Sequence, residues 1–194
     1  VSQQAQAAAV SHTASLTGSD TGADAFLQRL GIRRARSLPV FLESLKLAHQ
    51  FGPLSSNRIA SISCSGGEAA LAADTAQGTG LIFPPLNPRQ AKDLSAALGP
   101  MVAMANPLDY HTYIWRDQAA MTQAWAAMAD DEIAMTLLVS DYPRADLCDA
   151  SDWECVTQAA IEATRRTGRP YAVVASLAEL LPEQTAKTLM DHGV

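Results

Sequence analysis

The sequence is poor in the residues that mark several common classes of protein. Aromatic residues make up only 6% of the chain, and the three cysteines, Cys64, Cys148 and Cys155, form neither a CxxC pair nor a Cys/His cluster with zinc spacing. This pattern excludes a disulfide framework and a zinc module, and we expect no metal site. Unpaired thiols are typical of cytoplasmic proteins, so we expect a cytoplasmic location.

Long apolar runs and an excess of positive charge are also missing. No run approaches the roughly 20 apolar residues that a membrane span needs, and the start of the chain has neither the basic nor the apolar region of a signal peptide. The formal net charge of -6 argues against nucleic acid or an anionic membrane as a partner. The first residue is Val rather than Met, and we expect a processed or excised fragment.

The first part of the chain carries helix signals but no strand signal. Residues 1–19 are small and polar, which predicts a loop. Two helices are predicted next, the first from Asp20 to Gly31 and the second from Ser37 to Gly52, each ended by a glycine. We therefore interpret residues 1–52 as the tail of a preceding domain plus connecting helices.

From residue 57 onward, short apolar strands alternate with helices. The predicted strands are "RIASISC", "LIFPPL", "MVAMANPLDY", "IAMTLLVSDYP" and "PYAVVAS". Continuous apolar strands separated by helices indicate a parallel sheet covered on both faces. The sequence thus predicts an α/β protein in which residues 57–194 form a flavodoxin-like three-layer sandwich.

Ligands of such sheets bind beyond the carboxyl ends of the strands, so the segments there are candidate sites. After the first strand, Ser65, Gly66 and Gly67 precede a helix whose free N–H groups can cradle a phosphate. A tight strand-to-helix turn explains the same glycines equally well. Neither GxxxxGK[ST] nor GxGxxG is present, so neither of these nucleotide sites is supported.

Other residues near the strand ends allow more than one interpretation. Asn106 and Asp109 can aim polar groups into the crevice, but Asp109 can equally cap a short helix. Cys64 precedes a helix N-terminus, yet Ala70 stands where a Cys-x5-Arg phosphatase needs arginine. A buried thiol is therefore favoured over a nucleophile, and the lone loop residue His111 is expected to be solvated.

Three segments together resemble one protein family. "SHTASLTGSD" (residues 11–20) is similar to the SHTGSLAGSD segment of the nucleoside-diphosphate (NDP)-forming acyl-CoA synthetases, relatives of succinyl-CoA synthetase. "RIASISCSGGEAALAAD" resembles the strand, glycine turn and helix that the family writes as NAGGPGVLAAD, and "NPLDY" resembles its NPxD element. The three occur in the family's order and spacing.

The resemblance implies a function and a set of partners. His12 would be the transiently phosphorylated histidine, Ser65–Gly67 would bind phosphate, and residues 57–194 would be the CoA-ligase domain of an acid-thiol ligase. The complete enzyme would use CoA, ATP or ADP, Mg²⁺ and phosphate, with a small carboxylic acid or acyl-CoA as substrate. Its CoA-binding and ATP-grasp domains would be partners of this fragment, which we expect to be inactive alone.

The sequence departs from the family motifs at two positions, and two alternative functions remain open. Ala14 replaces a glycine, and Glu68 adds a carboxylate to the first turn of the helix that follows the glycines, where it competes with a bound phosphate. The same domains also occur fused to lysine acetyltransferases, as a regulatory module that binds ligand without turnover. The second alternative is a non-catalytic flavodoxin-like binding domain.

Overall fold

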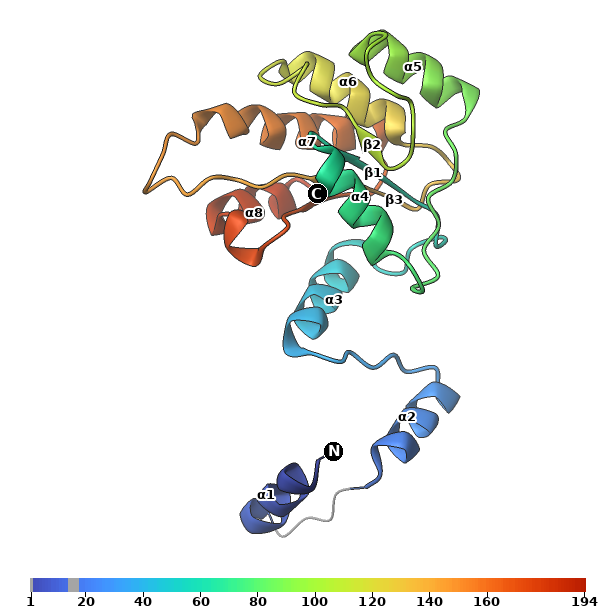
Figure 1. Ribbon diagram of the computed structural model, residues 1–194, viewed down its shortest axis with the longest axis vertical. Helices are drawn as coiled ribbons and strands as arrows, with labels where there is room; N and C mark the ends of the chain where they lie inside the picture. Colours follow the sequence, from blue (N-terminus) through green and yellow to red (C-terminus); the bar gives the residue numbers. More distant parts are fainter. Residues whose placement is uncertain (1, 14–17) are drawn as a thin grey trace. The chain divides into compact units, whose positions relative to one another are not determined.

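The computed structural model describes residues 2–13 and 18–194, in two compact units, Val1–Ala48 and His49–Val194 (Figure 1). Each unit is compact in itself. The helices are α1 (Gln3–Thr13), α2 (Asp20–Arg29), α3 (Leu38–Phe51), α4 (Gly66–Thr75), α5 (Pro88–Leu98), α6 (Gln118–Met128), α7 (Glu154–Thr167) and α8 (Glu183–Asp191). The strands are β1 (Ile59–Ser63), β2 (Leu108–Asp109), β3 (Met135–Val139) and β4 (Tyr171–Val174), and two short 3₁₀ helices are η1 (Ser151–Trp153) and η2 (Ala178–Leu180).

The first unit is helical. The expectation of a loop over residues 1–19 is wrong for Gln3–Thr13, where a run of Gln and Ala, both good helix formers, gives α1. In α2, the Ser19 side chain accepts a hydrogen bond from the Gly22 N–H at 3.0 Å and caps the helix. Both α2 and α3 match the helices predicted from the sequence.

The second unit is a three-layer α/β sandwich, as predicted. Its sheet is entirely parallel, with strand order β2-β1-β3-β4. Figure 1 shows α5, α6 and α7 on one face of the sheet and α4 and α8 on the other. None of the helices within the described ranges is long and apolar enough to cross a membrane.

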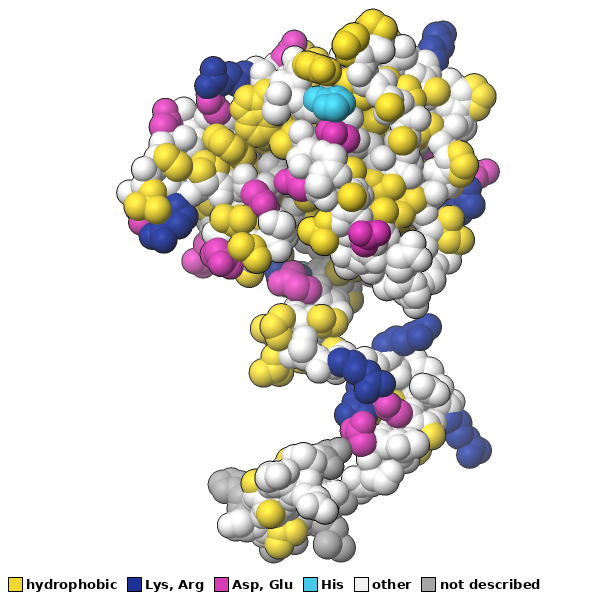
Figure 2. All heavy atoms as spheres, viewed as in Figure 1, with side chains coloured by type: hydrophobic (Ala, Val, Ile, Leu, Met, Phe, Trp, Pro, Cys, Tyr) yellow, Lys and Arg dark blue, Asp and Glu magenta, His cyan; other side chains and the backbone are white. Residues whose placement is uncertain are grey.

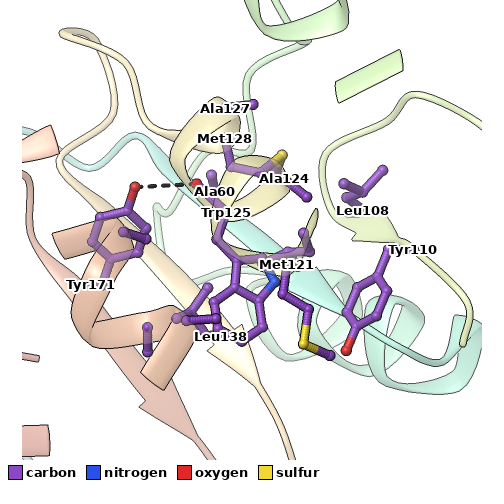
Figure 3. Packing of buried hydrophobic residues seen from close by; sticks show 14 of the residues in the cluster. Ala60, Leu108, Tyr110, Met121, Ala124, Trp125, Ala127, Met128, Leu138 and Tyr171 are labelled. Carbon is purple, nitrogen blue, oxygen red and sulfur yellow. Dashed lines mark hydrogen bonds between the residues drawn. The ribbon is translucent and has the colours of Figure 1, made fainter. Parts of the chain in front are cut away.

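The main core lies between the sheet and the layer that contains α6. Trp125 and Met121 of α6 pack over Leu138 of β3, as Figure 3 shows, and all three are almost fully buried. Burying a side chain of this size contributes about 1.5–3 kcal/mol. The Tyr171 hydroxyl donates a hydrogen bond to the carbonyl of Trp125 at 3.2 Å, which ties β4 to the same helix.

Two of the five predicted strands are not formed as expected. The segment "LIFPPL" makes only an isolated bridge, between Ile82 and Arg58, because Pro84 and Pro85 have no N–H to donate. Of the predicted strand "MVAMANPLDY", only β2 pairs with β1. The edge of the sheet beside β1 is therefore made of two short pieces of chain.

The side chain of Asn106 fills the gap between these two pieces. Its Oδ1 accepts a hydrogen bond from the Ser61 N–H at 3.0 Å, and its Nδ2 donates to the carbonyls of Ile59 at 3.0 Å and Pro84 at 3.1 Å. One side-chain amide thus takes the place of a peptide group in the ladder of β1. Asn106 was a possible site-lining residue from the sequence, and its amide lies inside the sheet.

Candidate functional site

The candidate site lies where β1 ends and α4 begins. The Ser63 hydroxyl donates a hydrogen bond to the carbonyl of Ser65 at 3.0 Å, which shapes the turn between strand and helix. Ser65 is the N-cap of α4 and has an extended backbone, but its side chain makes no capping hydrogen bond. The first N–H groups of a helix have no partner within the helix. At this turn they also have no side-chain cap from Ser65.

Asp109 of the neighbouring strand lies against this turn. It pairs in register with Ser63, and its Oδ1 accepts a hydrogen bond from the His111 N–H at 2.7 Å. A Cβ atom on Gly66 would be only 3.2 Å from Asp109 Oδ2. The glycine therefore allows a close approach of the Asp109 carboxylate, and the structure brings these two predicted site residues together.

The site is rich in carboxylates. Burial raises the pKa of Glu68, in the first turn of α4, and the negative charges of Asp141 and Asp109 raise it further. Figure 2 shows acidic side chains on the face of the second unit where α4 begins, with Lys and Arg side chains at the margins of that face. An anion that binds the α4 amides therefore meets repulsion from nearby carboxylates.

Cys64 is not activated by its place before the helix. Burial raises the pKa of its thiol, and Glu68 and Asp109 add to the shift. The Sγ atom lies 4.0 Å from Glu68 Oε2. A neutral, partly buried thiol fits the structural interpretation of this cysteine better than a nucleophile.

Two contributors to the site lie just past the ends of the neighbouring strands β3 and β4. Asp141 follows β3 and accepts hydrogen bonds from the N–H of Ser176, at 2.7 Å, and from its hydroxyl. Asp141 lies at the end of one of the predicted strands, but the sequence gave no reason to select Ser176. Only the position of each residue just past a parallel strand could have suggested the pair.

His111 is exposed but not isolated. Its Nδ1 lies 3.7 Å from Asp109 Oδ2, and its ring centroid is 5.2 Å from that of Tyr113. Its backbone has a φ of 55°, in the left-handed region that residues other than glycine rarely adopt. The loop thus fixes an imidazole beside the Asp109 carboxylate.

His12 belongs to the other unit. Its backbone lies in α1, and its side chain lies outside the described part of the chain, as does Ala14. The role given to His12 by resemblance therefore stays a prediction. Within residues 2–13 and 18–194, no group of three or more His, Cys, Asp or Glu side chains is placed to hold a metal ion.

One comparison with known proteins is in sequence. The chain matches no protein-family model. It is 34% identical over 110 residues to the alpha subunit of ADP-forming acetate–CoA ligase II from Pyrococcus furiosus, which covers 56% of this chain and 23% of that subunit. The match thus spans about a quarter of this relative.

Solved structures share the fold. A crystal structure of a Pyrococcus horikoshii protein has a TM-score of 0.70 and 22% identity, over 92% of this chain and 40% of the other. A dinucleotide-forming acetyl-coenzyme A synthetase 1 from Candidatus Korarchaeum cryptofilum, in complex with phosphate and ADP, has a TM-score of 0.68 and 16% identity, over 99% and 45%. The chain covers less than half of each of these proteins.

The parallel sheet, the helices on both of its faces and the glycine turn at its carboxyl edge define an α/β domain of the type found in the acetyl-CoA synthetase structure. The match in sequence points to a narrower class of protein than the fold does. Over those 110 residues the chain is similar to a subunit of an ADP-forming acetate–CoA ligase, in agreement with the resemblance of its motifs to the NDP-forming acyl-CoA synthetases.

Proposed function

We propose that this chain is part of an NDP-forming acyl-CoA synthetase. The enzyme would interconvert acyl-CoA, NDP and phosphate with a carboxylic acid, CoA and NTP, through acyl phosphate and phosphohistidine intermediates. The observation that carries the proposal is the 34% identity with an ADP-forming acetate–CoA ligase subunit, joined to the "SHTASLTGSD" segment around His12.

His12 would carry the phosphoryl group in two transfers. Phosphate first displaces CoA from the acyl-CoA, which gives the acyl phosphate. A neutral imidazole nitrogen of His12 then attacks phosphorus, the bond to the acyl oxygen breaks, and the carboxylate leaves. The β-phosphate oxygen of NDP finally takes the phosphoryl group, which forms NTP and returns the free imidazole.

The first turn of α4 is a suitable binding site for the phosphoryl group. Phosphoryl transfer depends on positioning and on electrostatic stabilisation of the oxygens. The uncapped amides of Ser65–Gly67 and the dipole of α4 supply both, at about 0.3–1 kcal/mol for an exposed site and up to about 2 kcal/mol when partly buried. CoA, ATP or ADP and Mg²⁺ would bind to other domains of the complete protein.

A second candidate function is favoured by the carboxylates around that turn. Glu68, Asp109 and Asp141 weaken the binding of a phosphate, and a regulatory module that binds ligand without turnover has no need for a strong phosphate site. On this alternative, the chain would sense an acyl-CoA within a lysine acetyltransferase. It requires no phosphorylation of His12.

Phosphate labelling separates the two functions. Full-length protein supplied with acyl-CoA and labelled phosphate, or with γ-labelled ATP, is expected to acquire an acid-labile, base-stable phosphate, and His12→Ala is expected to abolish it. His192→Ala is the control, because that imidazole only hydrogen-bonds the Thr188 carbonyl of its own helix, at 2.8 Å. Normal labelling and turnover in His12→Ala would refute the proposal.

A further inference from the structure

The edge strand β4 has open backbone groups on the side away from β3. The Val174 carbonyl accepts a hydrogen bond from the Ser140 N–H, just past β3, at 3.0 Å. In a parallel ladder alternate residues bond to the same neighbour, so the backbone groups of Tyr171 and Val173 point away from β3. Within residues 2–13 and 18–194, β4 pairs with β3 alone, and no other backbone hydrogen bond is donated by the Tyr171 or Val173 N–H.

This edge lacks the features that protect the edges of natural sheets. Proteins commonly blunt such edges with prolines, charged side chains or interruptions of the strand. The β4 residues, "YAVV", include no proline and no charge, whereas the opposite edge is interrupted by Pro84 and Pro85 and filled by Asn106. Val174 is 37% exposed, and Leu177, just past the strand, is 55% exposed. The sheet is thus protected at one edge and left open and apolar at the other.

The order of the strands indicates which kind of strand fits beside β4. All pairs are parallel, in the order β2-β1-β3-β4. These are the first four positions of the flavodoxin-like order 2-1-3-4-5, in which a fifth parallel strand lies next to the fourth. The open side of β4 is therefore the position of a parallel neighbour.

The size of the edge favours a segment of the same protein over a second copy of the chain. A two-fold axis would pair β4 with its copy in antiparallel orientation, and a strand of four residues supplies only a small part of the roughly 800 Å² per partner that a stable interface buries. A segment of the same protein binds at a high effective concentration and needs no such area. The chain spans less than half of the solved structures that share its fold.

The neighbouring side chains indicate the chemistry of that segment. A strand that adds to an open edge gains affinity from main-chain hydrogen bonds and specificity from its alternating side chains. Ala172 and Val174 flank the edge on one face of the sheet and Val173 on the other, and none of them can pair with a charge. Uncharged, β-branched side chains suit such surroundings.

We propose that the open edge of β4 binds a fifth parallel strand, an uncharged segment of the complete protein that lies outside these 194 residues. The N–H groups of Tyr171 and Val173 donate hydrogen bonds to it, and β-branched side chains of the segment pack beside Val173 and Val174. The inference rests on the proposed function only in taking this chain as part of a larger protein.

Hydrogen–deuterium exchange of the full-length protein, resolved to single amides, tests the inference. The Val173 amide faces the proposed strand, and the Ala172 and Val174 amides, which face β3, are its matched controls. We expect Val173 to exchange at a rate within about tenfold of both controls, because all three amides are then held in the sheet. Exchange of Val173 more than about tenfold faster than the controls would overturn the inference, since an amide at an open edge is not protected in this way.

Two further measurements identify the occupant of the edge. Protection of Val173 that is lost on dilution would show a second copy and overturn the inference, whereas protection independent of concentration supports it. A crystal structure of the full-length protein is expected to show a parallel strand beside β4. A helix, a loop or an antiparallel strand at that position would overturn the inference.

Failure of this inference is distinguishable from failure of the proposed function. Exchange at Val173 reports the edge of the sheet, whereas phosphate labelling reports His12. A fast Val173 amide in a protein that is labelled at His12 would remove the fifth strand and leave the proposed function standing. A protected Val173 amide in an unlabelled protein would do the reverse.

Discussion

Replacement of Asn106 by alanine is expected to destabilise the second unit by about 2–4 kcal/mol. The change removes three hydrogen bonds, each worth about 0.5–1.5 kcal/mol net, and leaves the N–H of fully buried Ser61 without a partner, which costs about 1–3 kcal/mol. The lower end of the combined range applies if water enters the space left by the side chain and satisfies part of the ladder.

Asn106→Asp sharpens the test. An aspartate keeps the acceptor for the Ser61 N–H but turns the donor that faces the carbonyls of Ile59 and Pro84 into a charged oxygen. We expect it to be at least as destabilising as alanine. Asn57→Ala is the control: that exposed amide makes a single hydrogen bond, to the Gly80 carbonyl, and its loss is expected to cost less than about 1 kcal/mol.

Urea unfolding followed by tryptophan fluorescence measures these effects. All three tryptophans of the chain, Trp115, Trp125 and Trp153, lie in the second unit, so the signal reports that unit alone. If Asn106→Ala unfolds within about 0.5 kcal/mol of wild type, the amide does not act as a rung of the sheet and the reasoning is refuted.

Two further changes test the cap of α5 and the charge at α4. Asn87→Ala removes a capping box with Gln90 and a hydrogen bond to Asp130 at 2.8 Å, and is expected to cost about 1–2 kcal/mol in the same unfolding assay; a loss below 0.3 kcal/mol would contradict it. Glu68→Gln is expected to stabilise the protein at pH 7 by up to about 1 kcal/mol. Because the pKa of folded Glu68 is raised above its ordinary 4.5, the stability that the protonated acid provides is present below that value and is lost as the pH rises through the folded pKa. The gain should therefore fade when both proteins are unfolded near pH 4, and an equal gain at both pH values would contradict the assignment.

Local signals predicted much of the second unit. Asn followed by Pro is typical of the start of a helix and Gly of its end, and the structure uses Asn87 and Gly99 as the caps of α5. The apolar run at residues 58–64 became β1, buried along its whole length. Such features depend on neighbours in the chain, which the sequence displays directly.

Features that depend on distant partners were not predictable in the same way. The role of Asn106 requires Ser61 and Pro84 to lie on either side of it, and the pairing of Asp141 with Ser176 requires two parallel strands to end together. The approach of Asp109 to Gly66 was anticipated only in outline, through the rule that strand ends gather at one edge. Composition also misled over residues 3–13, where small residues suggested a loop but had the propensity for a helix.

The interrupted edge beside β1 also affects how this protein meets other copies of itself. An unbroken edge strand presents a row of free N–H and C=O groups on which another chain can align, and this is a common route to aggregation. Here that border consists of the two residues of β2, one bridge at Ile82, and two prolines that cannot donate a hydrogen bond. Asn106 closes the gap from within by satisfying β1 with a side chain, so this edge of the sheet is completed without offering a template for a foreign strand.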